Sequence, residues 1–162
     1  APNSGSTFTI EIPVKRIPHQ KKNELNTPER HNFTGSHILI AEDNALNLEI
    51  ATMLLTDVGI EVTPATDGQI VIDKFTASSA GTFDLILMDI QIPVHNGYEA
   101  AEEIRRSSHP QAKTIPIVAM TANAFDEDVK HARASGMNDH LAKPIDVTKL
   151  YNTLARYLHS HT

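Results

Sequence analysis

The order of the apolar segments restricts the possible folds of this chain more than any other feature of its sequence. From His37 onward, five short apolar runs alternate with segments whose apolar residues recur at helical spacing. The runs predict strands at residues 37–41, 60–64, 83–88, 115–120 and 139–142. Strands that are apolar almost throughout are covered on both faces, so the pattern predicts a parallel sheet between two layers of helices.

Signals at the ends of the intervening segments support helices there. The predicted helices span residues 44–58, 97–106, 124–134 and 146–158, and one more begins after Asp67. The Asp67 side chain can cap that helix, and Gly59 and Gly136 stand where glycine commonly ends one. With right-handed crossovers, repeated strand–helix units leave few possible topologies.

The first 36 residues differ from the rest. Residues 7–12 alternate apolar and polar like a single strand, and the segment after them is polar, charged and interrupted by proline. We therefore expect a short strand and a linker in residues 1–36 and one domain in residues 37–162. The chain begins with Ala, which suggests that it is cut from a longer protein.

The composition argues against several kinds of site. The chain has no cysteine, so it has neither disulfides nor a thiolate site. Its 20 acidic and 14 basic residues give a net charge of −6, and no basic face stands out, which argues against nucleic acid as a partner. No apolar run is long enough to cross a bilayer and no signal peptide is present, so we expect a cytoplasmic segment without membrane contact.

Polar residues stand where the predicted strands end. Glu42 and Asp43 follow the first strand, Asp89 the third, Thr121 the fourth and Lys143 the fifth. The carboxyl ends of parallel strands share one edge of the sheet, where ligands bind, so we expect these side chains to converge. Three neighbouring carboxylates repel one another unless a cation neutralises them, and an all-oxygen set with few carboxylates favours Mg²⁺.

These residue types suit phosphoryl transfer. A carboxylate can form an acyl phosphate, a lysine can pair with a phosphoryl oxygen, and a threonine hydroxyl can donate to another oxygen while a metal ion assists. Taken singly, Asp43 and Thr121 are ordinary helix caps and Lys143 is an ordinary surface charge. Their combination at successive strand ends is what favours the catalytic interpretation.

Several segments carry a resemblance to a known family. They are residues 38–44, 84–93, 96–100, 117–124 and 142–144. Over about residues 37–158 the chain resembles the receiver domain of response regulators in two-component signalling. The resemblance implies an α/β fold of the flavodoxin-like (βα)5 type, with a doubly wound parallel sheet of five strands in the order 2-1-3-4-5.

The resemblance also implies which residues hold the phosphoryl group and its metal ion. Asp89 is expected to accept the phosphoryl group. Glu42, Asp43, Asp89 and the backbone carbonyl of Gln91 are expected to hold Mg²⁺.

Signal transmission is expected to involve Thr121 and Lys143, which contact the phosphoryl group in this family and rearrange with it. The Lys143–Pro144 peptide bond is expected to be cis, as it is in the family. His140 stands where many receivers have a switching Tyr or Phe. A switch role for His140 is one hypothesis, and a partly exposed residue at a strand end is the simpler one.

The sequences of residues 89–94 and 120–124 resemble those of receivers at the end of hybrid sensor histidine kinases. Residues 4–13 resemble the last strand of a kinase ATP-binding domain. The resemblance implies a parent chain, membrane-anchored in some such proteins, whose kinase domain supplies the phosphoryl group to Asp89. A histidine phosphotransfer domain then receives it. The present chain lacks the remainder of an ATP site, so we do not expect it to bind ATP.

The first helix of the domain is the expected docking face for the partner. Asn44, Ala45 and Leu48 are predicted to be exposed and to contact a partner helix. Leu46 and Ile50 are predicted to face the core, because they recur at helical spacing.

Three other interpretations fit the sequence less well. Phosphatases of the haloacid-dehalogenase type also phosphorylate an Asp at a strand end, but they need a second Asp two residues later as general acid, where this chain has Gln91. A pseudo-receiver usually lacks one of the key residues, and none is missing here. A nucleotide-binding fold needs a glycine-rich phosphate loop after the first strand, and this sequence has none.

Overall fold

A computed structural model describes residues 31–123 and 125–158. Strands and helices alternate along this part of the chain as the sequence predicted. The elements are β1 (His37–Ala41), α1 (Ala45–Asp57), β2 (Glu61–Ala65), α2 (Gly68–Thr76), β3 (Leu85–Asp89), α3 (Gly97–Arg106), β4 (Ile117–Thr121), α4 (Asp126–Ala134), β5 (Asp139–Ala142) and α5 (Val147–Tyr157).

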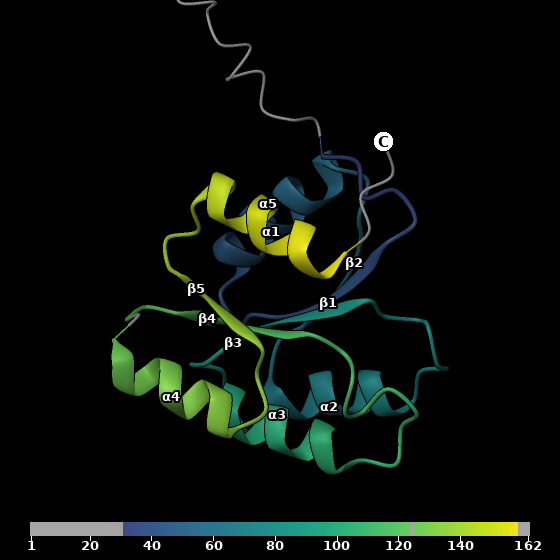
Figure 1. Ribbon diagram of the computed structural model, residues 1–162, viewed down its shortest axis with the longest axis vertical. Coiled ribbons are helices and arrows are strands. Elements are labelled where there is room, and N and C mark those ends of the chain that lie inside the picture. The colour runs from purple at the N-terminus through teal and green to yellow at the C-terminus, as the bar shows by residue number, and fades with distance from the viewer. Residues whose placement is uncertain (1–30, 124, 159–162) are drawn as a thin grey trace, which may run out of the picture. The chain divides into compact units, whose positions relative to one another are not determined.

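The strands form one parallel sheet in the order β2-β1-β3-β4-β5. Figure 1 shows α1 and α5 on one face of this sheet and α2, α3 and α4 on the other. The prediction of a doubly wound, flavodoxin-like sheet is therefore confirmed. The order reverses where β1 lies between β2 and β3, and the carboxyl ends of the strands beside such a switch point form a crevice.

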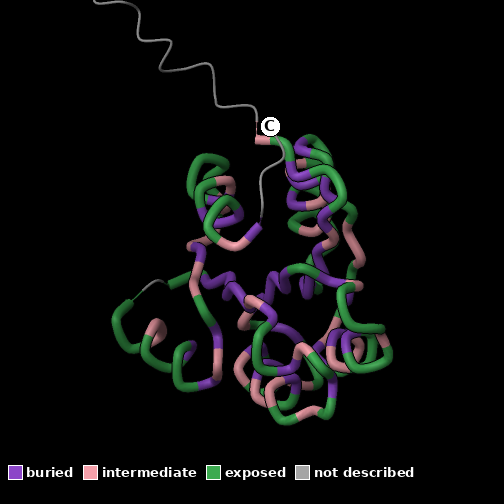
Figure 2. Tube along the Cα trace, turned by 45° about the vertical axis from the view of Figure 1, so that its right-hand side comes forward, coloured by how far each residue is buried: buried purple, intermediate pink, exposed green. Residues whose placement is uncertain are grey.

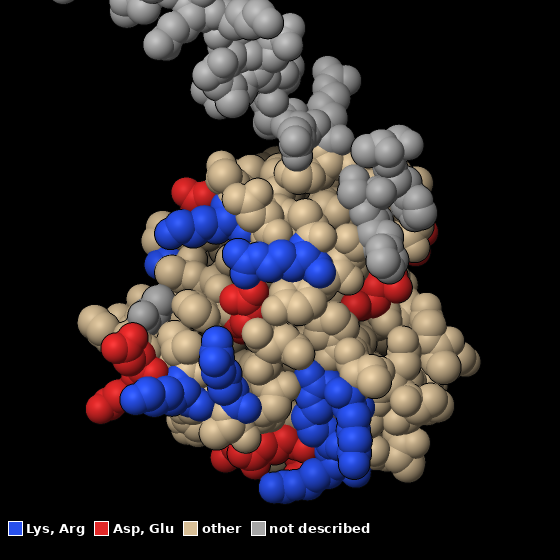
Figure 3. All heavy atoms as spheres, in the orientation of Figure 1, with Lys and Arg blue, Asp and Glu red and all other residues tan. Residues whose placement is uncertain are grey.

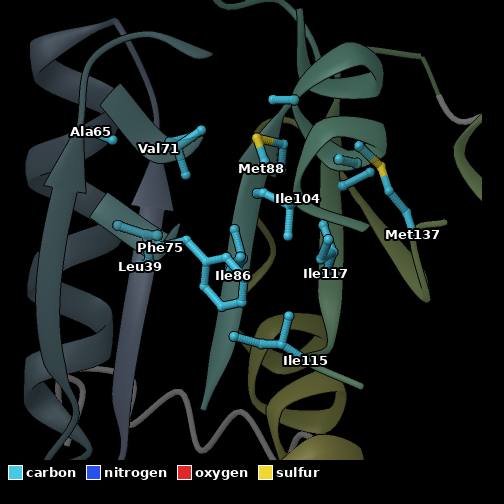
Figure 4. Close-up of a cluster of buried hydrophobic side chains, with 14 of the residues drawn as sticks. Leu39, Ala65, Val71, Phe75, Ile86, Met88, Ile104, Ile115, Ile117 and Met137 are labelled. Carbon is cyan, nitrogen blue, oxygen red and sulfur yellow. The ribbon is translucent and has the colours of Figure 1, made fainter. Parts of the chain in front are cut away.

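The core lies in two layers, one on each face of the sheet. One cluster packs beneath α2, α3 and α4, and Figure 4 shows its members Phe75, Ile86 and Ile104 converging from the helices and the sheet. The second cluster packs beneath α1 and α5 and includes Leu55 and Leu154. Figure 2 shows the buried segments at the centre and the exposed segments on the outer sides of the helices. This two-sided burial explains why the strands are nearly continuous apolar runs.

Glycine ends α1 as predicted. Gly59 has φ 87°, in the left-handed region where glycine bears no side-chain penalty. Its N–H donates to the carbonyl of Thr56, and the N–H of Ile60 donates to the carbonyl of Leu55. This pair of hydrogen bonds is a Schellman motif, which satisfies carbonyls that the helix end would leave unpaired. Gly136 ends α4 in the same way.

Side-chain caps fix the starts of most helices. The Asp67 carboxylate accepts from the N–H of Ile70, so the predicted cap of α2 is confirmed. Asn44 accepts from the N–H of Asn47 and caps α1. α4 begins at Asp126, later than expected, and its N-cap residue Phe125 makes no side-chain capping hydrogen bond. The observed limits of β2, β3 and β4 differ from the expected ones by one or two residues.

The face that α1 turns to the core differs from the expected one. Leu46 and Ile50 were predicted to be buried, but they are 63% and 41% exposed. Ala51 and Leu55 are buried instead, and Leu48 is half-buried and packs against the same cluster. Apolar residues surround this helix on nearly every side, so their spacing alone did not single out one face.

The described chain packs against the domain before β1 begins. The Phe33 side chain is fully buried, and its N–H donates to the carbonyl of Val58 at 2.8 Å. His31 stacks on the Phe33 ring. The compact unit therefore starts at His31. The predicted strand at residues 7–12, and the kinase remnant to which it would belong, lie outside the described residues and stay predictions.

Burial of Phe33 makes the segment before β1 part of the folding unit. Replacing a fully buried Phe by Ala removes apolar contacts and leaves a cavity, so Phe33→Ala should lower the free energy of unfolding by about 3–5 kcal/mol. Phe125→Ala is the matched control, because the Phe125 side chain is 69% exposed. Urea unfolding followed by circular dichroism measures both. Equal effects of the two substitutions would contradict the assignment.

Candidate functional site

The structure brings the predicted residues together at the carboxyl edge of the sheet. Glu42 follows β1, Asp89 ends β3 and Thr121 ends β4, and all three side chains are buried. Asp43 lies beside them and is exposed. Lys143 follows β5 and is half-buried. Residues at the carboxyl ends of β1, β3, β4 and β5 thus meet at one site.

Lys143 connects two of the carboxylates. Its Nζ lies 2.7 Å from Oε2 of Glu42 and 2.8 Å from Oδ2 of Asp89. The Lys143–Pro144 peptide bond is cis, as predicted, and the Lys143 N–H donates to the carbonyl of Thr121. One ammonium group therefore serves two buried carboxylates, while a third lies close by.

The backbone around Asp89 orients its carboxylate. Oδ1 of Asp89 accepts from the N–H of Gln91 at 3.0 Å. The chain then turns back, and the N–H of Gly97 donates to the carbonyl of Ile90. A Cβ atom at Gly97 would stand 2.5 Å from the carbonyl oxygen of Asp89 and 2.8 Å from the Cα of Ile90. Only glycine permits this approach, so Gly97 shapes the backbone beneath Asp89.

Burial and charge act on Asp89 and Lys143 in opposite ways. Burial raises the pKa of Asp89 above its ordinary value of 3.8, and the charge of Glu42 adds to the rise, although hydrogen bonds from Lys143 and Gln91 oppose it. Burial lowers the pKa of Lys143, but its hydrogen bonds to Asp89 and Glu42 outweigh that effect and raise the pKa. Lys143 is therefore charged at neutral pH, and the site holds more negative than positive charge.

Three carboxylates at this edge could hold a metal ion. Oxygen atoms of Glu42, Asp43 and Asp89 lie within 4.8 Å of one another. Glu42 and Asp89 each have one oxygen bound by Lys143, and their other oxygens accept from backbone N–H groups of Asn44 and Gln91. The donor set is all oxygen and carries excess negative charge, which fits a hard divalent cation.

Thr121 is not a helix cap. Its hydroxyl donates to the carbonyl of Asn123 at 2.8 Å and accepts from the N–H of the same residue at 3.1 Å. Phe125, not Thr121, precedes the first turn of α4. The alternative interpretation of Thr121 as a cap is therefore wrong, and its hydroxyl stands at the site, bound to the loop that follows β4.

His140 lies on β5 with its side chain 36% exposed. Together with Tyr98 and Thr121 it lines a narrow space beneath α4. The Tyr98 ring stacks on His131 of α4, with ring centroids 3.7 Å apart. A part-exposed strand-end residue matches the simpler hypothesis for His140, and its role as a switch stays a prediction.

An apolar hollow adjoins the carboxylates. It has a volume of about 400 Å³ and lies between α1 and the connection from β5 to α5. Ile50, Met120 and Pro144 line it beside Glu42 and Lys143. No sequence pattern predicted this hollow, because its walls come from distant parts of the chain.

The family of this chain follows from comparison with known proteins. Residues 38–155 match the response regulator receiver domain family. The chain therefore belongs to that family, whose members serve as receiver domains in two-component phosphorelay signalling.

Curated relatives include histidine kinases, among them a protein of Dictyostelium discoideum named hybrid signal transduction histidine kinase I, 38% identical over 119 residues and covering 72% of this chain and 7% of that protein. The chain is 35% identical over 121 residues to the peroxide stress-activated histidine kinase mak1 of Schizosaccharomyces pombe, covering 72% of this chain and 7% of that protein. It is 34% identical over 139 residues to the histidine-protein kinase BarA of Escherichia coli, covering 86% and 15%. The chain thus spans only a small part of the length of these relatives.

Two solved structures resemble the fold and its site. The receiver domain of a sensor histidine kinase from Pseudomonas aeruginosa, with magnesium coordinated in its active-site cleft, is 36% identical with a TM-score of 0.69, covering 78% of this chain and all of that one. The receiver domain of a Saccharomyces cerevisiae response regulator, crystallised with the histidine phosphotransfer protein Ypd1, is 32% identical with a TM-score of 0.67, covering 77% and 90%.

Charges of both signs occur on the surface. On the face drawn in Figure 3, blue Lys and Arg side chains are interspersed with red Asp and Glu side chains. Among the described residues, no helix is both long and apolar enough to cross a membrane.

The raised pKa of Asp89 predicts a pH-dependent stability. At pH values below the ordinary pKa of an Asp side chain, Asp89 is protonated and its contribution to the stability of the folded state is fully present. This contribution is lost as the pH rises through the raised pKa of Asp89. Asp89→Asn cannot ionise, so without divalent cations its melting temperature relative to the parent should increase from acidic to neutral pH.

Thermal unfolding across a pH series checks this prediction. Glu49→Gln is the control, because Glu49 is an exposed acidic residue of α1. A melting difference for Asp89→Asn that stays constant with pH would show that burial does not penalise the ionised carboxylate.

Proposed function

We propose that Asp89 accepts a phosphoryl group from a phosphohistidine and passes it to a histidine phosphotransfer domain. The observation that carries this proposal is the bridge from Lys143 to Asp89 and Glu42, with Asp43 beside them. Such an arrangement offers a carboxylate nucleophile, a fixed positive charge and a site for a cation at one place.

The proposed transfer needs no general base. An oxygen of the Asp89 carboxylate bonds to phosphorus as the bond from phosphorus to the donor imidazole nitrogen breaks, and the imidazole keeps the electron pair. Lys143 turns its charge to the incoming phosphoryl oxygens. The Thr121 hydroxyl exchanges its partner at Asn123 for a phosphoryl oxygen. The increase in rate over the same reaction in solution comes from positioning and charge stabilisation, as in other phosphoryl transfers.

Magnesium is the proposed cofactor. Glu42, Asp43, Asp89 and the backbone carbonyl of Gln91 would hold the ion, which neutralises charge on the phosphoryl oxygens when bound. The excess of carboxylates over the single ammonium group of Lys143 supports this assignment, and so does the magnesium ion in the similar Pseudomonas aeruginosa domain.

The proposed docking face is the exposed apolar side of α1 together with the hollow beside it. Leu46, Ile50 and Met53 follow one another at spacings of four and three residues, and each is at least 41% exposed. Ile50 also lines the hollow next to Lys143. A partner helix laid here would bring its histidine to Asp89. Leu48 is a weaker candidate than expected because it is half-buried, while Asn44 and Ala45 remain exposed candidates at the start of the helix.

A phosphatase acting on external substrates has less support. Gln91 stands where such enzymes need a general acid, and its described role is to donate a backbone N–H to Asp89. A receiver that is never phosphorylated would be expected to lack one of the site residues, whereas all of them converge here.

The parent protein is proposed to be a hybrid histidine kinase, on the strength of its curated relatives. In that setting the donor histidine belongs to the kinase of the same chain. The domain catalyses only transfer onto Asp89 and the loss of that phosphoryl group. The proposal also places this domain in the cytoplasm. It assigns residues 4–13 to the kinase ATP-binding domain of the parent chain, and it gives His140 a role in switching.

Removing the acceptor tests the proposal directly. Asp89→Asn should abolish acid-labile, base-labile labelling by a phosphohistidine protein, because an amide cannot form the acyl phosphate. Phosphotransfer from a radiolabelled donor, followed by mapping of the labelled peptide, measures this. Labelling of Asp89→Asn at the parental rate would refute the assignment of the acceptor.

Removing a metal ligand tests the role of magnesium. Asp43 is exposed, so Asp43→Ala should leave the fold intact while it lowers the rate of Mg²⁺-dependent phosphorylation by at least about a hundredfold. The rate is measured with acetyl phosphate over a range of Mg²⁺ concentrations. Persistent parental labelling in the presence of a chelator would show that no cation is needed.

Charging the docking face should separate partner binding from chemistry. Ile50→Glu should slow transfer from a phosphohistidine protein by about tenfold or more, because it places a charge in an apolar contact, while phosphorylation by acetyl phosphate stays nearly unchanged.

Thr56→Glu is the matched control, since Thr56 is exposed at the far end of α1. If Ile50→Glu slowed both reactions equally, Ile50 would support the site rather than a partner. If it slowed neither, the docking face would lie elsewhere.

A further inference from the structure

We infer that the start of α2 positions the phosphorylation site, because it packs against the loop between β3 and α3 and holds that loop in place. The residues that do so are Gly68 and Gln69 of α2, in contact with Pro93 and His95 of the loop. These are positioning residues, because neither Gly68 nor Gln69 touches Asp89. The inference rests on the proposed function and adds to it a second element that sets the geometry of Asp89 and its cation.

Gly68 meets the loop at a distance that only glycine allows. Its N–H donates to the carbonyl of Pro93 at 3.0 Å. A Cβ atom at Gly68 would overlap the carbonyl oxygen of His95 and stand 2.7 Å from the Cβ of His95. Gly68 itself has an ordinary helical backbone, so its conformation does not call for glycine; the neighbouring loop does.

Side chains strengthen the same contact. Nε2 of His95 lies 3.2 Å from Oε1 of Gln69, and Nδ1 of His95 lies 3.8 Å from a carboxylate oxygen of Glu99 on α3. His95 therefore joins α2 to α3 across the loop.

The loop needs such support because its backbone is strained. Val94 has φ 72°, in the left-handed region that a β-branched residue avoids. A strained residue persists only where its surroundings hold it. The residues on both sides of Val94, Pro93 and His95, are the ones that α2 contacts.

The loop passes this support to the site. At its start, the Gln91 N–H donates to Oδ1 of Asp89, and Ile92 is buried in the core cluster that also contains Val71 of α2. The Gln91 carbonyl is the backbone ligand proposed for Mg²⁺. A shift of the loop away from α2 would therefore turn the Asp89 carboxylate and move that ligand together.

The experiment compares two glycine substitutions. Gly68→Ala displaces the loop. Gly136→Ala is the matched control: it disturbs the fold at the end of α4, where φ is 89° and a Cβ atom would stand 2.8 Å from Cγ of Arg105. For each variant, the affinity for Mg²⁺ is measured by NMR titration, with the Gln91 amide as reporter, and the melting temperature is recorded. Asp43→Ala serves as the variant that loses the ion.

Gly68→Ala should weaken Mg²⁺ binding about tenfold or more, shift the Gln91 amide resonance without Mg²⁺, and slow labelling by acetyl phosphate even at saturating Mg²⁺. Gly136→Ala should lower the melting temperature and leave all three unchanged. Parental affinity and an unshifted Gln91 resonance in Gly68→Ala would overturn the inference. If the parent bound no Mg²⁺, the proposed function itself would fail.

A second set of variants covers the case in which Gly68→Ala does not fold. Gln69→Ala and His95→Ala each remove the side-chain link and leave Gly68 in place. Each single variant should weaken Mg²⁺ binding by about two- to fivefold. The double variant should bind Mg²⁺ as tightly as the weaker-binding single variant, because both substitutions remove the same contact. Parental affinity in both single variants would overturn the role of the link.

Discussion

The site depends on one ion pair that serves two buried carboxylates. Lys143 lies within hydrogen-bond distance of Glu42 and Asp89, and a third carboxylate, Asp43, has no such partner among the described contacts. Burying charge is costly unless it is paired. This cost of burying charge falls at one edge of the sheet, because the carboxyl ends of β1, β3 and β5 meet there. The remaining negative charge supports the proposed binding of a cation, and the proposed phosphoryl group would pair with Lys143 in place of part of this contact.

Each face of the sheet supports a different part of the proposed function. The cluster beneath α1 and α5 leaves Leu46, Ile50 and Met53 of α1 exposed beside the site, where a partner can bind. The cluster beneath α2, α3 and α4 includes Ile92 of the loop that follows Asp89 and Ala119 of β4. The proposed docking face thus lies on the opposite face of the sheet from the loop after Asp89, so a change of one helix layer need not disturb the other.

The sequence sufficed for the strands and for the convergence of Glu42, Asp89 and Lys143, because period and strand-end position are local properties. The order of the strands came from the family resemblance, since no local pattern determines it. It did not predict the face of α1, because apolar residues surround that helix on nearly every side. Phe33 was assigned to the linker, because a single aromatic residue in a polar segment shows no period. The close contact of Gly68 with His95 joins residues far apart in the chain, and no spacing rule predicts such a contact. Sequence patterns thus located the chemistry, while the supports of the site required the structure.

The hydrogen bonds of Thr121 explain how the site could respond to phosphorylation at little cost. Among the described residues, its hydroxyl is bound only to backbone atoms of Asn123, which is exposed. When such bonds break, water can satisfy the released groups, so the net loss is about 1 kcal/mol per bond. A phosphoryl oxygen is a charged acceptor and forms a stronger bond than a neutral carbonyl. The exchange proposed for Thr121 would therefore cost little, and it would release the loop between β4 and α4 from the Thr121 hydroxyl. α4 has one buried residue, Ala132, and its His131 ring stacks on Tyr98 of α3. Packing as light as this would let α4 move with the released loop if Asp89 is phosphorylated as proposed.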